Sequence, residues 1–365
     1  MQLGPLVIYF YFLVHCTVFG TLVNETEKVI LLHSRYYHGP WRLPKDRKIF
    51  QDLHCPVSNC KLTEDPQQYS RADAVIFHGP DLSVNIPDKL PQQRWVFLTI
   101  EPPDELPNLQ SHRKLLDLID WTSTYSSESD IRIVYGKFIS GQPSPIQYPF
   151  SPTPQPRIAS QIVDECGTGN QRDLYLRTLT SQLGADKMRV FGQCGDGFCR
   201  DMTEAQCLEM VSRSYRFYLA FERTNCREYI SEEFWRKALQ SNLIPVAMGG
   251  QRIDYERYAP PQSFIHAADF NSTKQFTEFL VKLSKDTERY QQYFDWQALG
   301  AARVGINGKN ISSNKYWCDL CAALNEPDEI RKPRARTRPI WKWWTADTQC
   351  DNKLVWHDLL TKIKD

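Results

Sequence analysis

Short apolar runs and helical segments alternate along the first half of the chain. Three of the runs, residues 29–32, 74–78 and 94–101, have the length and composition of buried strands. Between them, residues 65–71 and 108–118 are predicted to form helices. Alternation of this kind is typical of βαβ units, and it predicts an α/β fold with a mainly parallel sheet.

The second half resumes this alternation after a break. Residues 140–156 contain six prolines and are predicted to form a linker. Beyond the linker we expect a second α/β domain with strands and helices of its own. The expected strands are residues 158–163, 189–192, 215–222 and 243–249, and the expected helices are residues 172–183 and 231–242.

A long apolar segment begins the chain. Residues 1–24 carry no charge and residues 3–23 are nearly all apolar, which is about the length that spans a bilayer. An uncleaved membrane anchor fits this length. A cleaved signal peptide would have a basic start and a small-residue cleavage site such as residues 18–20, and a buried helix is the third alternative. The first two alternatives place the rest of the chain in the secretory lumen.

The cysteines and sequons agree with a lumenal location. Of the 11 cysteines, Cys16 lies in the apolar segment, which leaves an even number for the lumen. An even number in an oxidising compartment predicts disulfides, although two close cysteine pairs also resemble the spacing of zinc ligands. N-glycosylation sequons occur at Asn24, Asn271 and Asn310.

Composition excludes several classes of protein. With 44 basic and 43 acidic residues the net charge is +1, so a polybasic nucleic-acid binder is excluded. A mean hydropathy of −0.49 and a single long apolar run exclude a polytopic membrane protein. The aromatic content, with 18 Phe, 17 Tyr and 10 Trp, supports a large packed core rather than a disordered chain.

Candidate chemistry lies where the predicted strands end, because ligands of open α/β sheets bind at the carboxyl ends of strands. One strand ends at Glu222 and leads through a polar loop to Ser231, which is predicted to cap a helix. A helix N-terminus attracts phosphate, and Arg172 at the start of another helix suits phosphate oxygens. Glu232 is a candidate partner for sugar hydroxyls. Glu101 ends a strand of the first half and is a candidate general base.

Several segments together resemble the α1,3-fucosyltransferases of the inverting GT-B type. The resemblance rests on QRWVFLTIEPP, DWTSTYSSESDIRIVYG, YRFYLAFE, EYISEEFWRKAL and IPVAMGG, and it extends over about residues 29–350. It implies two Rossmann-like domains that face a cleft, preceded by a membrane anchor. It also implies that the chain transfers fucose from GDP-fucose to GlcNAc in α1,3 linkage.

Four further segments are most similar to invertebrate core-type enzymes, which modify the innermost GlcNAc of N-glycans. These segments are HCPVSNCKLT, FGQCGDGFC, YWCDLC and the tail from RKPR to WKWW. Lewis-type enzymes, which act on outer N-acetyllactosamine, are the alternative. The resemblance further implies that Cys55 and Cys60 pair with Cys318 and Cys321.

The resemblance gives the chain an expected organisation and location. We expect a Golgi membrane protein with a single-pass type II anchor, a lumenal catalytic part and a glycoprotein acceptor. No cofactor is required, although a divalent cation can be stimulatory. The expected segments are an anchor (residues 1–23), a short stem (24–28), an acceptor-side domain (29–157), a GDP-fucose-binding domain (158–330) and a C-terminal segment that returns to the first domain (331–365).

Carried over residue by residue, the resemblance makes Glu101 the general base and places Arg172 at the diphosphate. Tyr229 and Glu232 match the nucleotide-sugar loop, with Glu232 near the ribose, and Glu222 matches the glutamate that precedes this loop. The chain contains no D-x-D triplet. We therefore expect helix ends and basic residues, rather than a metal ion, to meet the diphosphate.

Two residues depart from the family pattern. Glu233 stands where the family has a lysine, and Arg223 stands where it has an asparagine. Because two like charges at roughly 4 Å repel by about 4 kcal/mol, we expect Glu233 to turn away from the diphosphate and to pair with Lys237, four residues on. Arg223 is then expected to supply the missing positive charge. The alternative is a catalytically silent relative that binds GDP or a glycan.

Overall fold

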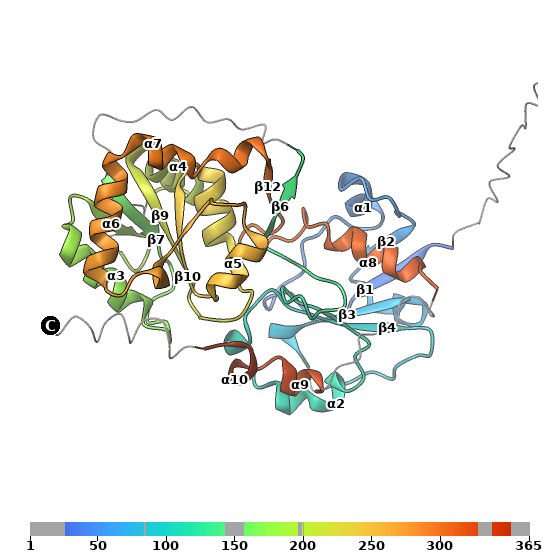
Figure 1. Ribbon diagram of the computed structural model, residues 1–365. Helices are drawn as coiled ribbons and strands as arrows, with labels where there is room; N and C mark the ends of the chain where they lie inside the picture. Colours follow the sequence, from blue (N-terminus) through green and yellow to red (C-terminus); the bar gives the residue numbers. More distant parts are fainter. Residues whose placement is uncertain are drawn as a thin grey trace, which may run out of the picture.

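Two five-stranded parallel sheets form the core of the computed structural model (Figure 1). The structure describes residues 26–83, 85–142, 157–195, 199, 201–327 and 338–351. The predicted α/β fold with parallel sheets is confirmed. The expected anchor and Asn24 lie outside the described residues, as do most of the expected linker and much of the expected C-terminal segment. Within the described ranges, no helix combines the length and apolar character that a membrane crossing requires.

The first sheet has the strand order β2-β1-β3-β4-β5, and all neighbouring strands run parallel. The three strands predicted in this half are β1, β3 and β4, at the centre of the sheet. β4 ends at Leu98, three residues before Glu101, so Glu101 lies just beyond the sheet. The bounds are β1 (Lys28–Leu32), β2 (Cys60–Thr63), β3 (Ala74–His78), β4 (Arg94–Leu98) and β5 (Trp121–Ser123).

The second sheet has the order β11-β10-β9-β7-β8, again with parallel neighbours. All seven residues of β9 are buried because it is a central strand with helices on both faces. Phe217 and Leu219 pack into one apolar cluster, and Tyr218 and Ala220 into the other. The strand bounds are β7 (Arg157–Ile162), β8 (Met188–Phe191), β9 (Tyr215–Phe221), β10 (Ile244–Met248) and β11 (Ile265–His266).

Longer helices accompany the second sheet than the first (Figure 1). The helix predicted over residues 172–183 is α3, with the same bounds. The helices of this half are α3 (Arg172–Leu183), α4 (Glu204–Ser214), α5 (Arg252–Tyr258), α6 (Thr273–Lys285) and α7 (Thr287–Gln292). The first half has α1 (Lys48–Asp52) and α2 (Arg113–Leu116), and the last helices of the described residues are α8 (Tyr316–Asn325), α9 (Ile340–Trp343) and α10 (Ala346–Gln349).

Three predicted helices are not regular α-helices. Residues 65–71 form a 3₁₀ helix, Pro66–Arg71, and residues 108–118 form the 3₁₀ turn Leu109–His112 followed by the single turn of α2. The helix expected over residues 231–242 is a π-helical segment, Glu233–Ala238, followed by a 3₁₀ turn. π-helical turns often occur at functional sites. Asn242 ends this segment in the left-handed conformation, with φ +57°.

Two kinds of connection join the halves. The antiparallel pair β6 (Gly136–Ser140) and β12 (Gly300–Val304) lies between the sheets, and α8 then packs against the first sheet (Figure 1). The disulfides Cys55–Cys318 and Cys60–Cys321 hold α8 there, which is the pairing that the resemblance implies. Three more disulfides are Cys166–Cys194, Cys199–Cys207 and Cys226–Cys350. The zinc alternative is wrong, because all the cysteines it needs are in disulfides.

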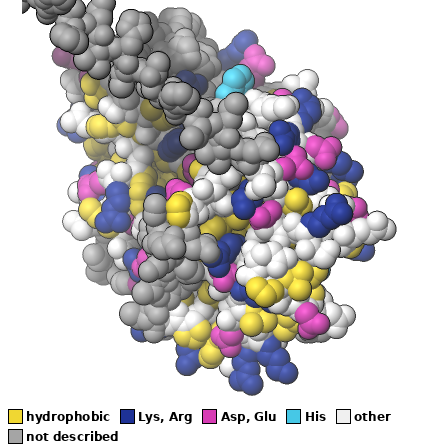
Figure 2. Space-filling model, turned by 90° about the vertical axis from the view of Figure 1, so that its right-hand side faces the viewer, with side chains coloured by type: hydrophobic (Ala, Val, Ile, Leu, Met, Phe, Trp, Pro, Cys, Tyr) yellow, Lys and Arg dark blue, Asp and Glu magenta, His cyan; other side chains and the backbone are white. Residues whose placement is uncertain are grey.

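The surface carries charges of both signs. On the face shown in Figure 2, Lys and Arg side chains lie interspersed with Asp and Glu over the described residues. This mixture agrees with the net charge of +1. The sequon residues Asn271 and Asn310 are both exposed.

Candidate functional site

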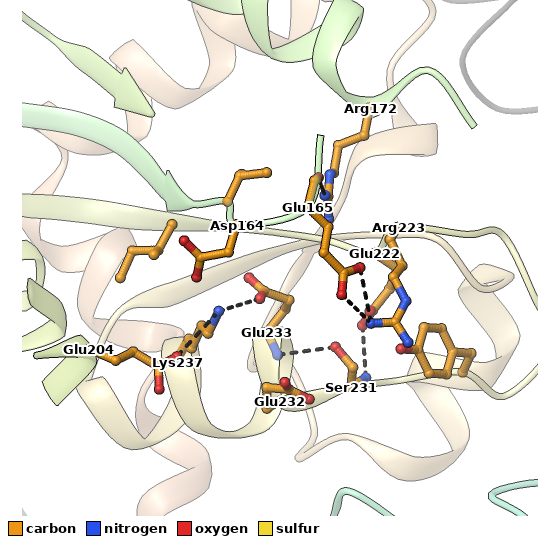
Figure 3. Close-up of a pocket in the computed structure, with 13 residues that line it drawn as sticks. Asp164, Glu165, Arg172, Glu204, Glu222, Arg223, Ser231, Glu232, Glu233 and Lys237 are labelled. Carbon is orange, nitrogen blue, oxygen red and sulfur yellow. Dashed lines mark hydrogen bonds and ion pairs between the residues drawn. The ribbon is translucent and has the colours of Figure 1, made fainter. Parts of the chain in front are cut away.

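A strongly charged pocket opens where β7 and β9 of the second sheet end (Figure 3). It encloses about 180 Å³ and collects all six residues that the sequence assigned to GDP-fucose binding. Those residues are Arg172, Glu222, Arg223, Tyr229, Glu232 and Lys237. The charged lining consists of three cations and six carboxylates: Arg172, Arg223, Lys237, Asp164, Glu165, Glu204, Glu222, Glu232 and Glu233.

Arg172 is held in place by neutral groups. It begins α3 after Gln171, whose backbone is left-handed with φ +60°. Its guanidinium donates to the carbonyl of Phe221 at 3.2 Å and to that of Glu165 at 2.7 Å. Two neutral carbonyls fix the orientation of the side chain without cancelling its charge, so Arg172 is suited to meet an anion in the pocket.

Glu222 organises the loop that follows β9. Its carboxylate accepts a hydrogen bond from the backbone N–H of Ser231 at 2.8 Å, and the hydroxyl of Ser231 accepts from the N–H of Glu233 at 3.2 Å (Figure 3). Burial raises the pKa of Glu222 to about 8. Gly249 lies behind it with φ +145°, and a Cβ there would come within 2.5 Å of the Glu222 side chain. The Ser231 hydroxyl thus binds an N–H at the start of the π-helical segment, as expected of a cap, although Glu232 is the residue directly before the segment and its side chain makes no cap hydrogen bond.

Glu233 pairs with Lys237, as predicted. Lys237 Nζ lies 2.6 Å from Glu233 and 3.5 Å from Glu204 (Figure 3). The other carboxylate oxygen of Glu233 accepts from the hydroxyl of Tyr218 at 2.7 Å. Although burial acts to lower the pKa of Lys237, Glu233 and Glu232 together hold it above its usual value. The ammonium group therefore stays charged at the pocket wall.

Arg223 reaches from the second half to the first. It forms an ion pair with Glu101, and its Nε lies 3.4 Å from Glu105. On its own side of the cleft, Nη1 lies 3.3 Å from Glu165. One guanidinium thus contacts three carboxylates that come from both halves of the molecule. The sequence singled out Arg223 as a cation for the diphosphate, but it gave no sign of the pairing with Glu101.

Glu101 has a partner on each carboxylate oxygen. One oxygen accepts a hydrogen bond from the hydroxyl of Tyr37, and the other pairs with Arg223. The backbone N–H of Glu101 donates to the Thr99 hydroxyl at 3.0 Å, and Pro102 follows. The carboxylate is largely buried and lies between the two halves. This position suits a general base that meets a substrate in the cleft.

Tyr37 is the residue near Glu101 that the sequence did not indicate. Its backbone is left-handed, with φ +50°, and its N–H donates to Asp81 at 2.7 Å. The neighbouring N–H of His38 donates to the other oxygen of Asp81 at 2.8 Å, and the ring of His78 bonds Asp81 at 2.7 Å. Although burial opposes it, this set of hydrogen bonds lowers the pKa of Asp81 to about 2. The adjacent tyrosines Tyr36 and Tyr37, which follow β1, were the feature of the sequence that could have indicated this contact with Glu101.

Tyr229 belongs to an aromatic cluster that joins the halves. Its ring lies 5.1 Å from that of Tyr125 and 5.8 Å from that of Tyr135, both from the first half. The guanidinium of Arg223 lies 6.0 Å from the Tyr229 ring. Contacts of this kind stabilise an interface beyond the area they bury. The pocket and Glu101 are therefore built on elements packed against one another.

Two family models match almost the whole folded part of the chain. "Fucosyltransferase, N-terminal" matches residues 25–136, and "Glycosyltransferase family 10 (fucosyltransferase) C-term" matches residues 153–343. The chain belongs to the family 10 fucosyltransferases. The two matches meet near the linker predicted at residues 140–156, and together they contain Glu101 and every residue of the charged pocket.

Curated relatives are similar over most of the chain. Glycoprotein 3-alpha-L-fucosyltransferase A of Drosophila melanogaster is 32% identical over 334 residues, which is 89% of this chain and 62% of that protein. The chain thus spans less than two thirds of this relative. A human 4-galactosyl-N-acetylglucosaminide 3-alpha-L-fucosyltransferase is 31% identical over 323 residues, covering 87% of this chain and 83% of that protein.

A solved structure has the same fold. It is a crystal structure of an alpha1,3-fucosyltransferase with GDP, and it matches with a TM-score of 0.52 over 85% of this chain and 93% of that one. The sequences are 15% identical, so this likeness establishes the fold of this family member and leaves its site to be argued from its own residues.

Proposed function

We propose that this chain is an inverting α1,3-fucosyltransferase that uses GDP-fucose as donor. The observation that carries the proposal is the position of Glu101, which lies at the edge of the first half and pairs there with Arg223 of the charged pocket. A carboxylate on one side and a cation-bearing strand-end pocket on the other are what transfer from a nucleotide sugar to a hydroxyl requires.

The chemistry follows from this arrangement. Glu101 accepts the proton of the acceptor hydroxyl while that oxygen attacks the anomeric carbon of fucose from the face opposite GDP. The carbon–oxygen bond to the diphosphate breaks, GDP leaves with the bonding electron pair, and the anomeric configuration inverts from β to α. Arg172 and Arg223 offset the charge that develops on the leaving diphosphate. Glu232 is within the same pocket, which supports its assignment to the ribose. No metal is needed for these steps, although a divalent cation can stimulate product release.

The innermost GlcNAc of an N-glycan is the acceptor we favour. The similarity to the Drosophila glycoprotein 3-alpha-L-fucosyltransferase A supports this choice. The outer N-acetyllactosamine of Lewis-type substrates is the second candidate, and the similarity to the human galactosyl-N-acetylglucosaminide enzyme supports it. We further propose that the enzyme acts in the Golgi lumen, anchored as a type II protein by its apolar residues 1–23.

One observation favours a catalytically silent binder as the alternative function. The pocket carries six carboxylates and three cations, a balance that is unfavourable for a diphosphate. Burial raises the pKa of Glu222 to about 8 and also raises the pKa of Glu232, so protonation of these two carboxyls reduces the excess of negative charge. For this reason we rank the active enzyme first.

The test is fucose transfer by the full-length chain. The purified protein is given GDP-fucose with an N-glycan core glycopeptide or with N-acetyllactosamine, and products are identified by mass. Fucose on the core GlcNAc supports the favoured acceptor, and fucose on the lactosamine supports the Lewis-type alternative. If folded protein binds GDP but transfers fucose to neither acceptor, the enzyme proposal is wrong and the silent binder remains.

A further inference from the structure

Both oxygens of the Glu101 carboxylate are occupied, one by each side of the cleft. Tyr37 binds one oxygen from the first half, and Arg223 binds the other from the second half. We propose that Tyr37 and Arg223 are positioning residues that cap Glu101, and that each cap is displaced by one substrate. The diphosphate of the donor draws Arg223 away, and the acceptor hydroxyl replaces the hydroxyl of Tyr37. This inference rests on the proposed function and deepens it.

Arg223 has the contacts expected of a group that changes partners. Its side chain contacts Glu101, Glu105 and Glu165, and it also lines the pocket assigned to the diphosphate. A diphosphate carries more charge than one carboxylate and can accept both arms of a guanidinium fork. A donor in the pocket therefore competes with Glu101 for Arg223. It binds Arg223 only when the ion pair between Arg223 and Glu101 breaks.

The size of the pocket agrees with such a displacement. Its volume of about 180 Å³ is below the roughly 300–1,000 Å³ that is usual for sites that hold small molecules. Arg223 lines the pocket and pairs with Glu101 and Glu105 of the first half, so its movement both enlarges the pocket and breaks these two ion pairs between the halves. Binding of the donor and release of Glu101 are then one event.

Tyr37 is fixed through its backbone and also through its ring, which packs against the rings of Tyr36 at 4.7 Å and His78 at 4.8 Å. The N–H groups of Tyr37 and His38 are both anchored on Asp81, and Tyr36 packs against His78 at 4.5 Å. The Tyr37 ring itself contacts Lys309 Nζ at 3.8 Å from its centroid. The loop thus holds the phenol hydroxyl against one oxygen of Glu101. Because the Glu101 side chain is only 11% exposed, we expect an acceptor hydroxyl to reach that oxygen by taking the place of the phenol.

Two caps protect the donor from water. While both are in place, each oxygen already accepts one hydrogen bond and the Glu101 side chain is only 11% exposed, so a water molecule has little access to the remaining lone pairs of the general base. When the donor has removed Arg223 and the acceptor has replaced Tyr37, the proton of the acceptor hydroxyl passes to Glu101. The new glycosidic bond then forms as GDP leaves with its electron pair.

GDP affinity tests the Arg223 cap without any need for turnover. We compare the full-length wild type with Glu101→Gln, Arg223→Ala and the double variant by titration calorimetry with GDP. Glu101→Gln removes the competing charge and is expected to tighten GDP binding about tenfold, which is about 1.4 kcal/mol. Arg223→Ala is expected to weaken it, and in that background Glu101→Gln is expected to have no further effect.

An unchanged or weaker affinity of Glu101→Gln for GDP overturns the Arg223 cap, whether or not the wild type transfers fucose. Arg213→Ala is the matched control, because Arg213 forms an exposed ion pair with Glu209 on α4 and does not line the pocket. It is expected to leave GDP affinity unchanged. If the wild type transfers no fucose but Glu101→Gln still binds GDP more tightly than the wild type, the proposed function is wrong and the Arg223 cap is retained.

Hydrolysis of GDP-fucose tests the Tyr37 cap. Without acceptor, Tyr37→Phe is expected to release fucose several-fold faster than the wild type, because one oxygen of Glu101 is then free for water. Tyr69→Phe is the matched control, since the Tyr69 hydroxyl donates to a backbone carbonyl at 2.8 Å on the surface. An unchanged or slower hydrolysis in Tyr37→Phe, with native-like thermal unfolding, overturns this cap.

Discussion

Glu101 and Glu222 each follow an apolar parallel strand, one in each sheet, yet their surroundings differ. Glu101 lies between the halves, where a guanidinium and a phenol from different elements bind its two oxygens. Glu222 lies almost entirely buried within one half, where a backbone N–H binds it and burial raises its pKa to about 8. The Glu101 carboxylate is thus held by both halves, whereas Glu222 fixes a loop of its own half at the wall of the charged pocket.

The difference arises from the residues that follow each glutamate. Two prolines follow Glu101, so the backbone turns away from the sheet and the carboxylate stays at the cleft. After Glu222 the chain returns through Ser231, whose N–H closes on the carboxylate. An acidic residue at a strand end therefore identifies a site only when the path of the next few residues is known.

The largest effect should come from removing the charge of Glu101. Glu101→Gln is expected to lower kcat for fucose transfer about 1,000-fold, because the amide cannot accept the proton of the acceptor hydroxyl. Steady-state assays with the preferred acceptor measure it, with thermal unfolding as the check on folding. Glu222→Gln is the paired variant and is expected to retain a much larger share of kcat. Equal losses in both variants would contradict the distinction between the two carboxylates.

The ion pair of Lys237 with Glu233 at the charged pocket should contribute strongly to the stability of the second half. Lys237→Met leaves Glu233 and its neighbour Glu232 buried without their cation, so the free energy of unfolding is expected to fall by about 3 kcal/mol. Denaturant titration measures the change. The control is Lys48→Met, which breaks an exposed pair of the same i,i+4 spacing with Asp52 at 3.0 Å. A similar loss in both variants would show that burial of the Lys237 pair does not matter.

Contacts between residues close in the sequence could be predicted from it, whereas contacts between distant residues could not. The Glu233–Lys237 pair was predictable because four residues separate its members on one helical turn. The contacts of Glu101 with Arg223 and with Tyr37 were not predictable from the sequence. The partners are 122 and 64 positions apart in the sequence, so the folded arrangement of distant segments decides these contacts. Seven of the ten strands in the two sheets were predictable from apolar runs, whereas the short strands β2, β5 and β11 at the sheet edges were not. The π-helical form of residues 233–238 was not, since its side-chain pattern is that of an ordinary helix.

Glu222 should make stability depend on pH. Between its ordinary pKa of 4.5 and the folded value of about 8, the native protein keeps a proton that the unfolded chain has lost. The free energy of unfolding therefore falls as pH rises through this window. Glu222→Gln lacks this slope, so relative to the wild type it is expected to gain about 3.5 kcal/mol from about pH 5 to about pH 8. Denaturant titrations at both pH values measure it. Glu256→Gln on the exposed face of α5 is the control, and the same gain there would refute the assignment to Glu222.

The smallest effect is expected from Ser231→Ala, which tests whether the loop after Glu222 serves the fold alone or also binds GDP. Ser231→Ala removes the hydroxyl that accepts from the N–H of Glu233, and it is expected to lower the free energy of unfolding by about 1 kcal/mol. Ser272→Ala removes a comparable cap at the start of α6, where Ser272 accepts from Gln275 at 3.1 Å, far from the pocket. The two variants should lose similar stability.

Ser231→Ala should in addition weaken GDP binding several-fold in calorimetric titrations, because Ser231 lines the pocket and fixes the helix end that meets the diphosphate. If both variants bind GDP like the wild type, the helix start contributes to the fold alone, and the positive charge for the diphosphate must come from Arg172 and Arg223.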